Sequence, residues 1–242
     1  MKEKVVLAYS GGLDTTVLIP WLKETYNYDV ICVCIDVGQG NELDGLEERA
    51  KYCGASKLYI EHVVDEFCDE YIAPCVKANA TYENKYLLGT AMARPLIAKI
   101  LVDIAKKEGA VAICHGATGK GNDQIRFDMT FLVLAPNVEI ITLTRDMALS
   151  RDFEINYLKE HGFEADFTKL KYSYNVGLWG TSICGGEILD SAQGLPESAY
   201  LKQVEKTGSE QLRIEFKNGE VHAVNGEVFE DKIAAIQKIE EI

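Results

Sequence analysis

Ser10-Gly11-Gly12-Leu13-Asp14-Thr15-Thr16, close to the start of the chain, is the most informative segment of the sequence. Residues 5–9 before it form a short apolar, partly β-branched run, which predicts a buried strand. After it, Leu13, Val17 and Trp21 recur at four-residue spacing, which is typical of a helix that packs one face against a core. The stretch therefore predicts a strand, a tight glycine turn and a helix in direct succession.

The glycine pair of this turn suits a phosphate group. Gly11 and Gly12 allow the backbone to turn tightly and to approach a ligand closely. The following helix directs free N–H groups and the positive end of its dipole into the turn. An ordinary interpretation is also open, in which Ser10 or Asp14 only caps the helix. On chemistry alone the two interpretations are close to even.

Two common phosphate-binding motifs are absent from the sequence. There is no G-x-G-x-x-G, which disfavours a dinucleotide site even though Asp36 follows the second predicted strand. There is also no G-x-x-x-x-G-K-[ST], because no Ser or Thr follows Lys120 in the glycine-rich run of residues 116–121. Residues 9–16 do fit the pattern S-G-G-x-D-[ST], and they resemble the pyrophosphate loop of enzymes that cleave ATP between its α and β phosphates.

Composition excludes several classes of function. The 242 residues are 47% hydrophobic and carry a formal net charge of −13, which indicates a globular protein with an acidic surface and no nonspecific nucleic-acid binding. No signal-peptide core precedes Ser10 and no long apolar span follows, so we expect a cytoplasmic chain without a membrane segment. The seven cysteines form no C-x-x-C and join no histidine cluster, so free thiols are expected and no metal site.

Alternating strands and helices predict an α/β domain. Strands are expected over residues 29–35, 57–63, 111–114 and 138–143. Helices are expected over residues 46–53 and 64–80, around the apolar stripe of residues 96–104 up to Gly109, and from residue 124. This alternation implies parallel strands joined by right-handed crossovers, hence a doubly wound parallel sheet. Ligands of such sheets bind beyond the carboxyl ends of the strands, where the loops 10–16 and 116–123 both lie. We expect Pro20 to kink the first helix and Pro95 to lie in the first turn of its own.

The pattern of the sequence changes near Phe167, and we expect two domains, over residues 1–165 and 166–242. Two Asn-Gly pairs, at residues 218–219 and 225–226, separate short β-rich runs, which predicts a small antiparallel meander. Residues 231–242 form a final predicted helix with a stripe of isoleucines. The second domain is therefore expected to be smaller and of the α+β type.

Four further segments extend the likeness of the pyrophosphate loop to one family: residues 36–39, 82–95, 115–127 and 172–183. The third, His115-Gly-Ala-Thr-Gly-Lys-Gly-Asn-Asp-Gln-Ile-Arg-Phe, is long and particular. With these segments the chain resembles argininosuccinate synthase, a carbon–nitrogen ligase of arginine biosynthesis and the urea cycle. The resemblance implies an adenine nucleotide alpha hydrolase-like sheet followed by a smaller, incomplete α+β domain. It also implies a reaction that joins citrulline to aspartate, uses ATP with Mg²⁺, and releases AMP and pyrophosphate.

The resemblance also assigns roles to individual residues, although none is assigned as catalytic. ATP is expected to contact Ala8, Tyr9, Ser10, Gly11, Gly12, Leu13, Asp14, Thr15, Thr16, Ile35 and Gly116, the last two through backbone atoms. Citrulline is expected to contact Tyr86, Asn122, Arg126, Ser173 and Ser182, and aspartate Thr118, Asn122 and Asp123. Arg126 offers a planar fork to a carboxylate, and Asn122 can donate and accept at once.

Each assignment has a plainer alternative. In the plainer interpretation Tyr86 is a core tyrosine, and Arg126 is a surface partner of Asp128 or an ordinary helix charge. Ser173 and Ser182 are instead loop hydroxyls bonded to their own backbone.

The chain also departs from the family in places. Thr16 replaces the commoner serine and Ile35 the usual alanine, while residues 174–177 and Cys184 stand where acids are frequent. Family members also continue beyond the equivalent of Ile242 through the rest of a second domain, which supplies further citrulline contacts.

Three functions are consistent with the sequence. The chain is a ligase, whole or completed by a separate polypeptide and then homo-oligomeric, or it is an ATP-binding remnant with little turnover. Alternatively it is another pyrophosphate-loop enzyme such as a tRNA thiolase, which the acidic composition and the lack of a paired catalytic cysteine disfavour.

Overall fold

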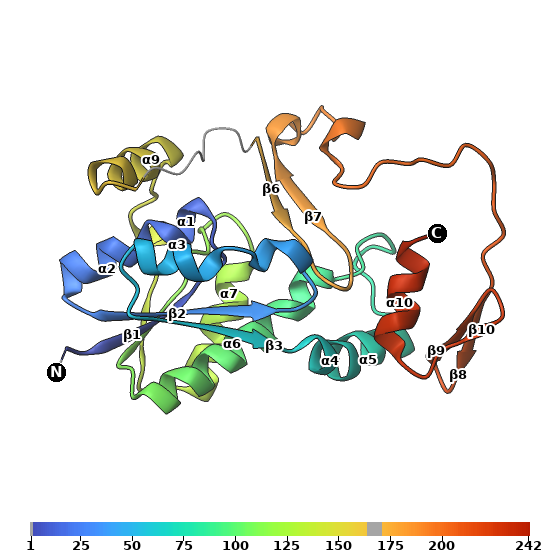
Figure 1. Ribbon diagram of the computed structural model, residues 1–242, viewed down its shortest axis with the longest axis horizontal. Helices are drawn as coiled ribbons and strands as arrows, with labels where there is room; N and C mark the ends of the chain where they lie inside the picture. The colour runs from blue at the N-terminus through green and yellow to red at the C-terminus, as the bar shows by residue number, and fades with distance from the viewer. Residues whose placement is uncertain (1, 164–170) are drawn as a thin grey trace. The chain divides into compact units, whose positions relative to one another are not determined.

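The computed structural model describes residues 2–163 and 171–242 (Figure 1). The chain falls into two compact units. The first comprises Met1–Asp36, Gly40–His62 and Ala93–Phe167, and the second Val37–Gln39, Val63–Met92 and Thr168–Ile242. The domain boundary expected at residues 165–166 lies outside the described residues and stays a prediction.

A five-stranded parallel sheet forms the centre of the first unit. Its strands are β1 (Lys4–Ala8), β2 (Asp29–Asp36), β3 (Lys57–His62), β4 (Ala112–Cys114) and β5 (Glu139–Ile141). Their order is β3-β2-β1-β4-β5, and every neighbouring pair is parallel. β1 is flanked on both sides, with Leu7 opposite Cys32 of β2 and Cys114 of β4. The parallel α/β sheet expected from the sequence is confirmed.

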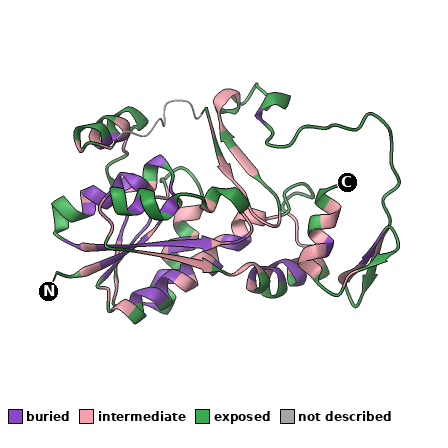
Figure 2. Ribbon diagram, viewed as in Figure 1, coloured by how far each residue is buried: buried purple, intermediate pink, exposed green. Residues whose placement is uncertain are grey.

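Helices cover both faces of this sheet. They are α1 (Leu13–Thr16), α2 (Leu18–Tyr26), η1 (Gly40–Leu43), α3 (Leu46–Tyr52), α6 (Gly89–Glu108), α7 (Asp123–Leu134), α8 (Leu143–Asp146) and α9 (Arg151–Glu160). α2 and α3 lie on one face and α6 on the other (Figure 1). Val5 and Leu7 of β1 pack with Leu18 and Leu22 of α2 in a buried core, and the buried residues of this unit gather along the sheet (Figure 2).

The two prolines of these helices behave differently. The first helix is interrupted at Val17, between α1 and α2. The kink expected from Pro20 therefore lies three residues before the proline. Pro95 lies inside α6 and not in its first turn, because the helix begins at Gly89. The prediction for Pro95 was wrong because residues 91–94, Ala-Met-Ala-Arg, are all strong helix formers and extend the helix upstream.

The second unit begins its helical part with α4 (Val64–Glu66), the π-helical segment η2 (Phe67–Ile72) and α5 (Ala73–Lys77). The single helix expected over residues 64–80 therefore has a π-helical middle. A hairpin that was not foreseen follows, formed by the antiparallel strands β6 (Tyr172–Asn175) and β7 (Ser182–Gly185). Two short 3₁₀ segments come next, η4 (Gly186–Leu189) and η5 (Glu197–Ala199).

The predicted meander is present as a three-stranded sheet of order β10-β9-β8. Its strands are β8 (Ile214–Lys217), β9 (Glu220–Val224) and β10 (Glu227–Val228). Asn218 and Asn225 have φ values of 55° and 50°, the left-handed conformation that the tight hairpin turn requires. The final helix α10 (Lys232–Glu240) follows, with Asp231 as a cap that accepts a 2.9 Å hydrogen bond from the Ile233 N–H.

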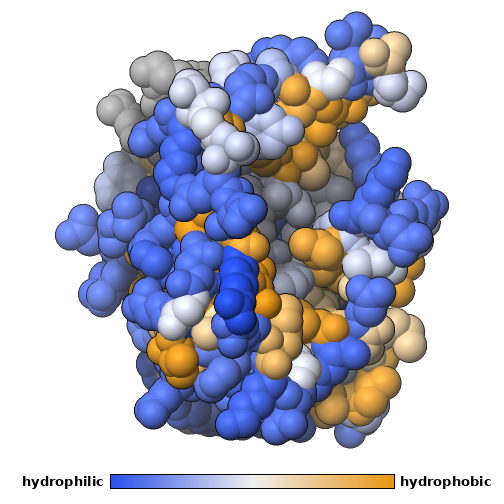
Figure 3. Space-filling model, turned by 90° about the vertical axis from the view of Figure 1, so that its right-hand side faces the viewer, coloured by the Kyte–Doolittle hydropathy of each residue, from blue (hydrophilic) through white to orange (hydrophobic). Residues whose placement is uncertain are grey.

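α10 does not close the second unit completely. An apolar groove of about 240 Å³ lies between η2, α5, the β8–β9 hairpin and α10, with Ile72, Phe216 and Ile236 among its walls. Figure 3 faces the side of the C-terminal elements and shows hydrophobic side chains exposed among hydrophilic ones.

Within residues 2–163 and 171–242, no helix has the length and apolar character needed to cross a membrane.

Replacing Pro95 by alanine should stabilise the chain, because an interior proline leaves the carbonyl of Ala91 without its helical donor. We expect the free energy of unfolding in urea to rise by about 1–2 kcal/mol. Pro196→Ala is the control for the effect of proline on the unfolded chain, since Pro196 precedes η5 and lies in no helix. Lower stability of Pro95→Ala would mean that the shape of the proline, and not its missing N–H, governs α6.

Candidate functional site

The two glycine loops meet at the centre of the sheet. β1 and β4 are hydrogen-bonded neighbours, while the strands that follow them, β2 and β5, lie on opposite sides of this pair. This arrangement is the topological switch point at which open α/β sheets bind their ligands. A Cβ atom added at Gly116 would lie 3.1 Å from Thr15 Cγ2, so the loop after β4 packs directly against the loop after β1.

Weak internal hydrogen bonds shape the first loop. The Ser10 N–H donates to Thr15 Oγ1 at 3.4 Å, and the Ser10 hydroxyl lies 3.2 Å from the same oxygen. Thr15 Oγ1 in turn donates to the Gly12 carbonyl at 3.3 Å, and the Gly12 N–H approaches Ser10 Oγ at 3.4 Å. These distances are long for hydrogen bonds, and Ser10 and Gly12 are exposed. Their donors can therefore exchange internal bonds for stronger bonds to an anion.

The two glycines of this loop serve different purposes. Gly11 has a φ of 77°, and a Cβ atom there would lie 2.2 Å from Leu46 Cδ2, so the fold itself requires glycine. Its carbonyl accepts a 2.7 Å hydrogen bond from Arg49 Nη1 of α3. Gly12 has a φ of −73°, and a Cβ atom there would meet Ser10 Oγ at an ordinary 3.5 Å. Packing therefore does not require glycine at position 12.

Several residues expected to bind ATP direct their side chains into the core. Tyr9, Leu13, Thr16 and Ile35 are all buried. Burial raises the pKa of Tyr9 to about 12, so its phenol stays neutral. These residues, like Ala8 at the end of β1, therefore have mainly backbone atoms to offer a ligand.

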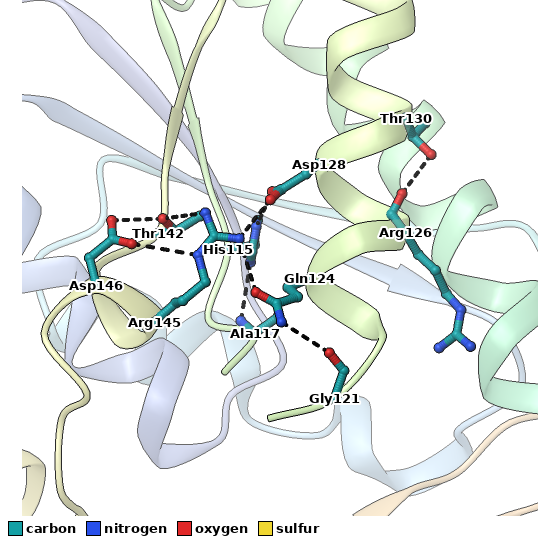
Figure 4. Close-up of polar contacts among 10 residues, drawn as sticks. All are labelled: His115, Ala117, Gly121, Gln124, Arg126, Asp128, Thr130, Thr142, Arg145 and Asp146. Atoms are coloured by element: carbon teal, nitrogen blue, oxygen red, sulfur yellow. Dashed lines mark hydrogen bonds and ion pairs between the residues drawn. The ribbon is translucent and has the colours of Figure 1, made fainter. Parts of the chain in front are cut away.

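His115, which follows β4, supports the second loop. It is fully buried, and its Nδ1 accepts a 3.2 Å hydrogen bond from the Ala117 N–H. Because Nδ1 accepts, Nε2 carries the proton and donates to Asp128 Oδ1 of α7 at 2.9 Å. Burial lowers the pKa of His115, although Asp128 opposes the shift, so the imidazole is neutral near pH 7. The neutral ring thus ties the loop backbone to α7 (Figure 4).

Arg145 of α8 extends this network on the other side of Asp128. Its Nη1 donates to Asp128 Oδ2 at 2.6 Å and to Gln124 Oε1 at 3.1 Å, and its Nη2 donates to Thr142 Oγ1 at 2.9 Å. Partial burial tends to raise the pKa of Asp128, but the hydrogen bonds from Arg145 and His115 outweigh it and hold that pKa below its ordinary value. Asp128 is therefore a carboxylate at neutral pH and the shared acceptor of both side chains (Figure 4).

Gln124 connects this network back to the second loop. Its Nε2 donates to the carbonyl of Gly119 at 3.0 Å and to that of Gly121 at 3.2 Å. The loop is consequently held at Ala117 by His115 and at its far end by Gln124.

Asp123, the first residue of α7, lies between two arginines. Its Oδ1 accepts a 2.7 Å hydrogen bond from Arg126 Nη1, and its Oδ2 one of 3.0 Å from Arg94 Nε. Arg126 pairs with Asp123, while Asp128 pairs with Arg145, so the interpretation of Arg126 as a surface partner of Asp128 was wrong. Within the described residues this pair uses one guanidinium nitrogen of Arg126, which leaves its Nε and Nη2 for a ligand.

Thr118 and Asn122, the other expected substrate contacts of this loop, are exposed. Asn122 precedes α7, and among the described residues its side-chain amide makes no capping hydrogen bond to the helix. The amide is therefore available to a substrate.

The second unit holds three of the expected citrulline contacts. Tyr86 is 37% exposed, so it is not a core tyrosine, and its hydroxyl accepts a 3.3 Å hydrogen bond from the Ala91 N–H. The Ser182 hydroxyl lies 2.9 Å from Thr90 Oγ1. Tyr86 and Ser182 are thus both anchored to the first turn of α6.

Ser173 and Ser182 lie in strands, β6 and β7, and not in loops. The interpretation of both as loop hydroxyls bonded to their own backbone was therefore wrong. Ser173 is exposed and lies opposite Cys184 in the hairpin.

Comparison with known proteins assigns the chain to a family. A family model described as the arginosuccinate synthase N-terminal HUP domain matches residues 4–164. The chain belongs to the argininosuccinate synthase family. The argininosuccinate synthase of Lachnospira eligens is 65% identical over 196 residues, which are 79% of this chain and 48% of that protein. The argininosuccinate synthase of Lachnoclostridium phytofermentans is 57% identical over 237 residues, 93% of this chain and 58% of that protein.

A third argininosuccinate synthase, from Caldanaerobacter subterraneus, is 50% identical over 246 aligned positions, which cover 99% of this chain and 60% of that protein. The chain thus spans 48% to 60% of the length of these three relatives.

Three residues near the two loops were not singled out from the sequence. Arg94 lies within residues 82–95, whose likeness to the family was a signal that could have marked it. Arg145 and Glu154 lie outside the matching segments, and only the fold brings them to the loops.

Glu154 of α9 lies against the first loop, beside Asp14. Its side chain is 2% exposed, and its Oε1 has no hydrogen-bond partner among the described residues. Burial, followed by the nearby Asp14 carboxylate, raises the pKa of Glu154 to about 8. The side chain is therefore a neutral acid at pH 7, and it meets Asp14 without charge repulsion.

Replacing Glu154 by glutamine should remove a pH dependence of stability. Between about pH 5 and pH 8 the folded chain keeps a proton on Glu154 that the unfolded chain has lost, so stability falls as the pH rises. Glutamine keeps the shape and does not titrate, so the stability of the variant relative to the parent should increase across this range, by up to about 1.4 kcal/mol per pH unit. Urea unfolding at a series of pH values measures the trend.

Glu160→Gln, an exposed position on the same helix, is the matched control, and its stability should follow that of the parent at every pH. Parallel curves for Glu154→Gln and the parent would show that Glu154 is ionised in the folded chain.

Proposed function

We propose that the first unit binds ATP across the loops 10–16 and 116–123, for the AMP- and pyrophosphate-forming ligation of citrulline with aspartate. The observation that carries the proposal is Gly12, which is glycine without any need of the fold and lies at the switch point between β1 and β4. The phosphates would lie over Ser10, Gly11 and Gly12. The weakly bonded N–H groups of Ser10 and Gly12 could then donate to a phosphate instead. The nucleoside would lie along the backbone of Ile35 and Gly116.

Mg²⁺ accompanies ATP in this proposal. Among the described residues no group of three His, Cys, Asp or Glu side chains is placed to hold a metal ion by itself. Such a cage is not needed, because Mg²⁺ keeps several waters and is commonly held by substrate phosphates with one or two carboxylates. Asp14, exposed at the start of α1, is the carboxylate that this loop offers. When bound with ATP, the ion would neutralise part of the phosphate charge.

Citrulline and aspartate are proposed to contact the polar residues that the family resemblance named. For citrulline these are Tyr86, Asn122, Arg126, Ser173 and Ser182, and for aspartate Thr118, Asn122 and Asp123. The guanidinium of Arg126 suits a carboxylate, and the Asn122 amide can bond both substrates. Asp123 is oriented by Arg94 and Arg126, so its oxygens are fixed in place for an ammonium group.

The proposed reaction depends on positioning more than on acid–base chemistry. The ureido oxygen of citrulline attacks the α-phosphorus of ATP and pyrophosphate leaves, after which the amine of aspartate displaces AMP. The residues of this chain would hold the reacting atoms together, and the N–H and hydroxyl groups of the 10–16 loop would stabilise the charge on the leaving pyrophosphate. No side chain is assigned as the general base.

ATP binding and complete ligation are separate proposals, because the chain spans 48% to 60% of its relatives. Titration with Mg·ATP tests the first, and release of pyrophosphate with citrulline and aspartate tests the second. Binding without release would support the second candidate function, an ATP-binding unit with little turnover. Membership of the argininosuccinate synthase family removes the support for a tRNA thiolase.

Gly12→Val should abolish binding of ATP while the chain stays folded. A side chain fits the backbone at position 12 without a clash, but it would occupy the space through which the phosphates approach. Calorimetric titration with Mg·ATP measures the loss, and the melting temperature verifies the fold. Gly11→Ala is the contrasting control, because its φ of 77° and the contact with Leu46 should lower stability first. Unchanged ATP affinity in folded Gly12→Val would contradict the proposal.

Arg126→Lys should weaken the binding of citrulline without changing the affinity for ATP. Lysine keeps the charge but loses the planar fork, so we expect citrulline binding to weaken by ~1.5–3 kcal/mol, the usual worth of a hydrogen bond to a charged group. Titration with citrulline, in the presence of Mg²⁺ and a non-hydrolysable ATP analogue, measures the effect. Arg213→Lys, an exposed arginine of the second unit, is the control. Equal losses for both ligands would show that Arg126 is structural.

A further inference from the structure

Each glycine loop of the first unit is secured by an arginine from an element outside that loop. Arg49 of α3 donates directly to the carbonyl of Gly11 in the first loop, at 2.7 Å. Arg145 of α8 acts on the second loop through Gln124, whose amide donates to the carbonyls of Gly119 and Gly121. The backbone that surrounds the switch point is thus set from two sides by two cations.

Arg145 is fully engaged in this task. Nη1 bonds Asp128 and Gln124, Nη2 bonds Thr142, and Nε lies 3.5 Å from Asp146 Oδ1. Thr142 also donates to Asp146 Oδ2 at 2.8 Å, which fixes the partners themselves (Figure 4). A guanidinium can satisfy these divergent partners at once, whereas an ammonium is a single point charge on a flexible stem.

Arg145 also packs against the loop that it controls. A Cβ atom added at Gly119 would lie 3.4 Å from Arg145 Cγ, so the aliphatic part of the arginine runs close beside the loop backbone. Its side chain is about one-third exposed, at 30%, so the cation lies at the edge of the site and not deep in the core.

The hydrogen bonds close into a ring that includes the loop. Arg145 and the His115 Nε2–H share the carboxylate of Asp128. His115 Nδ1 accepts from Ala117 at the start of the loop, and Gln124 holds Gly119 and Gly121 at its end. Residues 117–121 are therefore spanned by one continuous chain of bonds, in which Arg145 joins the two halves through Asp128 and Gln124.

We propose that Arg145 is a positioning residue, which sets the backbone of residues 117–121 so that Thr118 and Asn122 are presented to the amino-acid substrates. The substrate part of this proposal rests on the proposed function, whereas the control of the loop backbone does not. Arg145 itself is not proposed to touch a substrate. Loss of Arg145 should weaken the binding of citrulline and aspartate more than that of ATP. ATP is assigned chiefly to the first loop, residues 10–16, which Arg49 holds.

Amide hydrogen exchange of the folded chain tests control of the loop. In Arg145→Met, peptides that cover residues 116–121 should exchange about 10-fold faster at the amide of Ala117, which donates to His115 Nδ1 within this network, as expected for the loss of one hydrogen bond to a charged group. Peptides of β1 and β2 should be unchanged. Arg145→Lys should resemble Arg145→Met, because lysine cannot restore the fork. Arg49→Met is the matched control and should accelerate exchange in residues 10–13 but not in residues 116–121.

A double-mutant cycle tests whether Arg145 works through Gln124. If the two residues act in series, Arg145→Met combined with Gln124→Leu should accelerate exchange of the loop no further than Gln124→Leu alone. Fully additive effects would contradict this route.

Ligand titrations separate positioning from plain stability. Arg145→Met should lower the affinity for citrulline and for aspartate about 10-fold, measured in the presence of a non-hydrolysable ATP analogue. It should change the affinity for Mg·ATP less than about twofold. Unchanged exchange at residues 116–121 would overturn the proposal. Faster exchange throughout the unit with equal losses for all three ligands would also overturn it, since Arg145 would then be structural. Failure of the parent chain to bind Mg·ATP would refute the proposed function, while the exchange result still decides the role of Arg145 in the loop.

Discussion

Strand β1 is hydrogen-bonded to a parallel neighbour along each of its edges, and the geometry of the site follows from this pairing. Val5, Val6 and Leu7 are fully buried, so the strand cannot shift its register without exposing core residues on one face or the other. Parallel neighbours bring their carboxyl ends together, and β4 is one of those neighbours. The loops that follow β1 and β4 must therefore emerge side by side, at the point where the connections diverge and leave room for a ligand.

The polar network around Asp128 shows how such a loop is held without a regular secondary structure. Buried polar groups destabilise a protein unless they are bonded, and here His115, Asp128, Arg145 and Gln124 satisfy one another and three backbone groups of the loop. The network depends on a neutral His115, because a protonated Nδ1 could not accept from Ala117. Burial of the ring, which lowers its pKa, keeps it in that form at neutral pH.

Residues that the fold needs and residues that it does not need stand next to each other in the first loop. Gly11 is required by its backbone conformation and by Leu46, whereas Gly12 is under no such constraint. Asp14 is exposed, while its neighbour Glu154 is buried and protonated. A position whose residue type is not explained by packing is the better guide to function, and Gly12 is such a position.

The strands of the first unit and its helices α1, α2, α3, α6 and α7 could be predicted from the sequence, because they follow from apolar periodicity and glycine turns, which are local in the chain. The helix α9, which carries Glu154, was not predicted. The hairpin turns of the meander were predictable too, since Asn-Gly strongly favours the left-handed conformation that such turns require, and both pairs adopt it here. The start of α6 was missed because intrinsic helix preference in residues 91–94 extended the helix beyond the proline signal. The partners of the site residues became known only from the three-dimensional structure. Asp123 pairs with Arg94 and Arg126, and Arg145 donates to Gln124, which lies 21 positions away. Glu154 contacts Asp14, which lies 140 positions earlier (154 − 14). Side-chain contacts between distant segments depend on strand order and helix packing, which local patterns in the sequence do not encode.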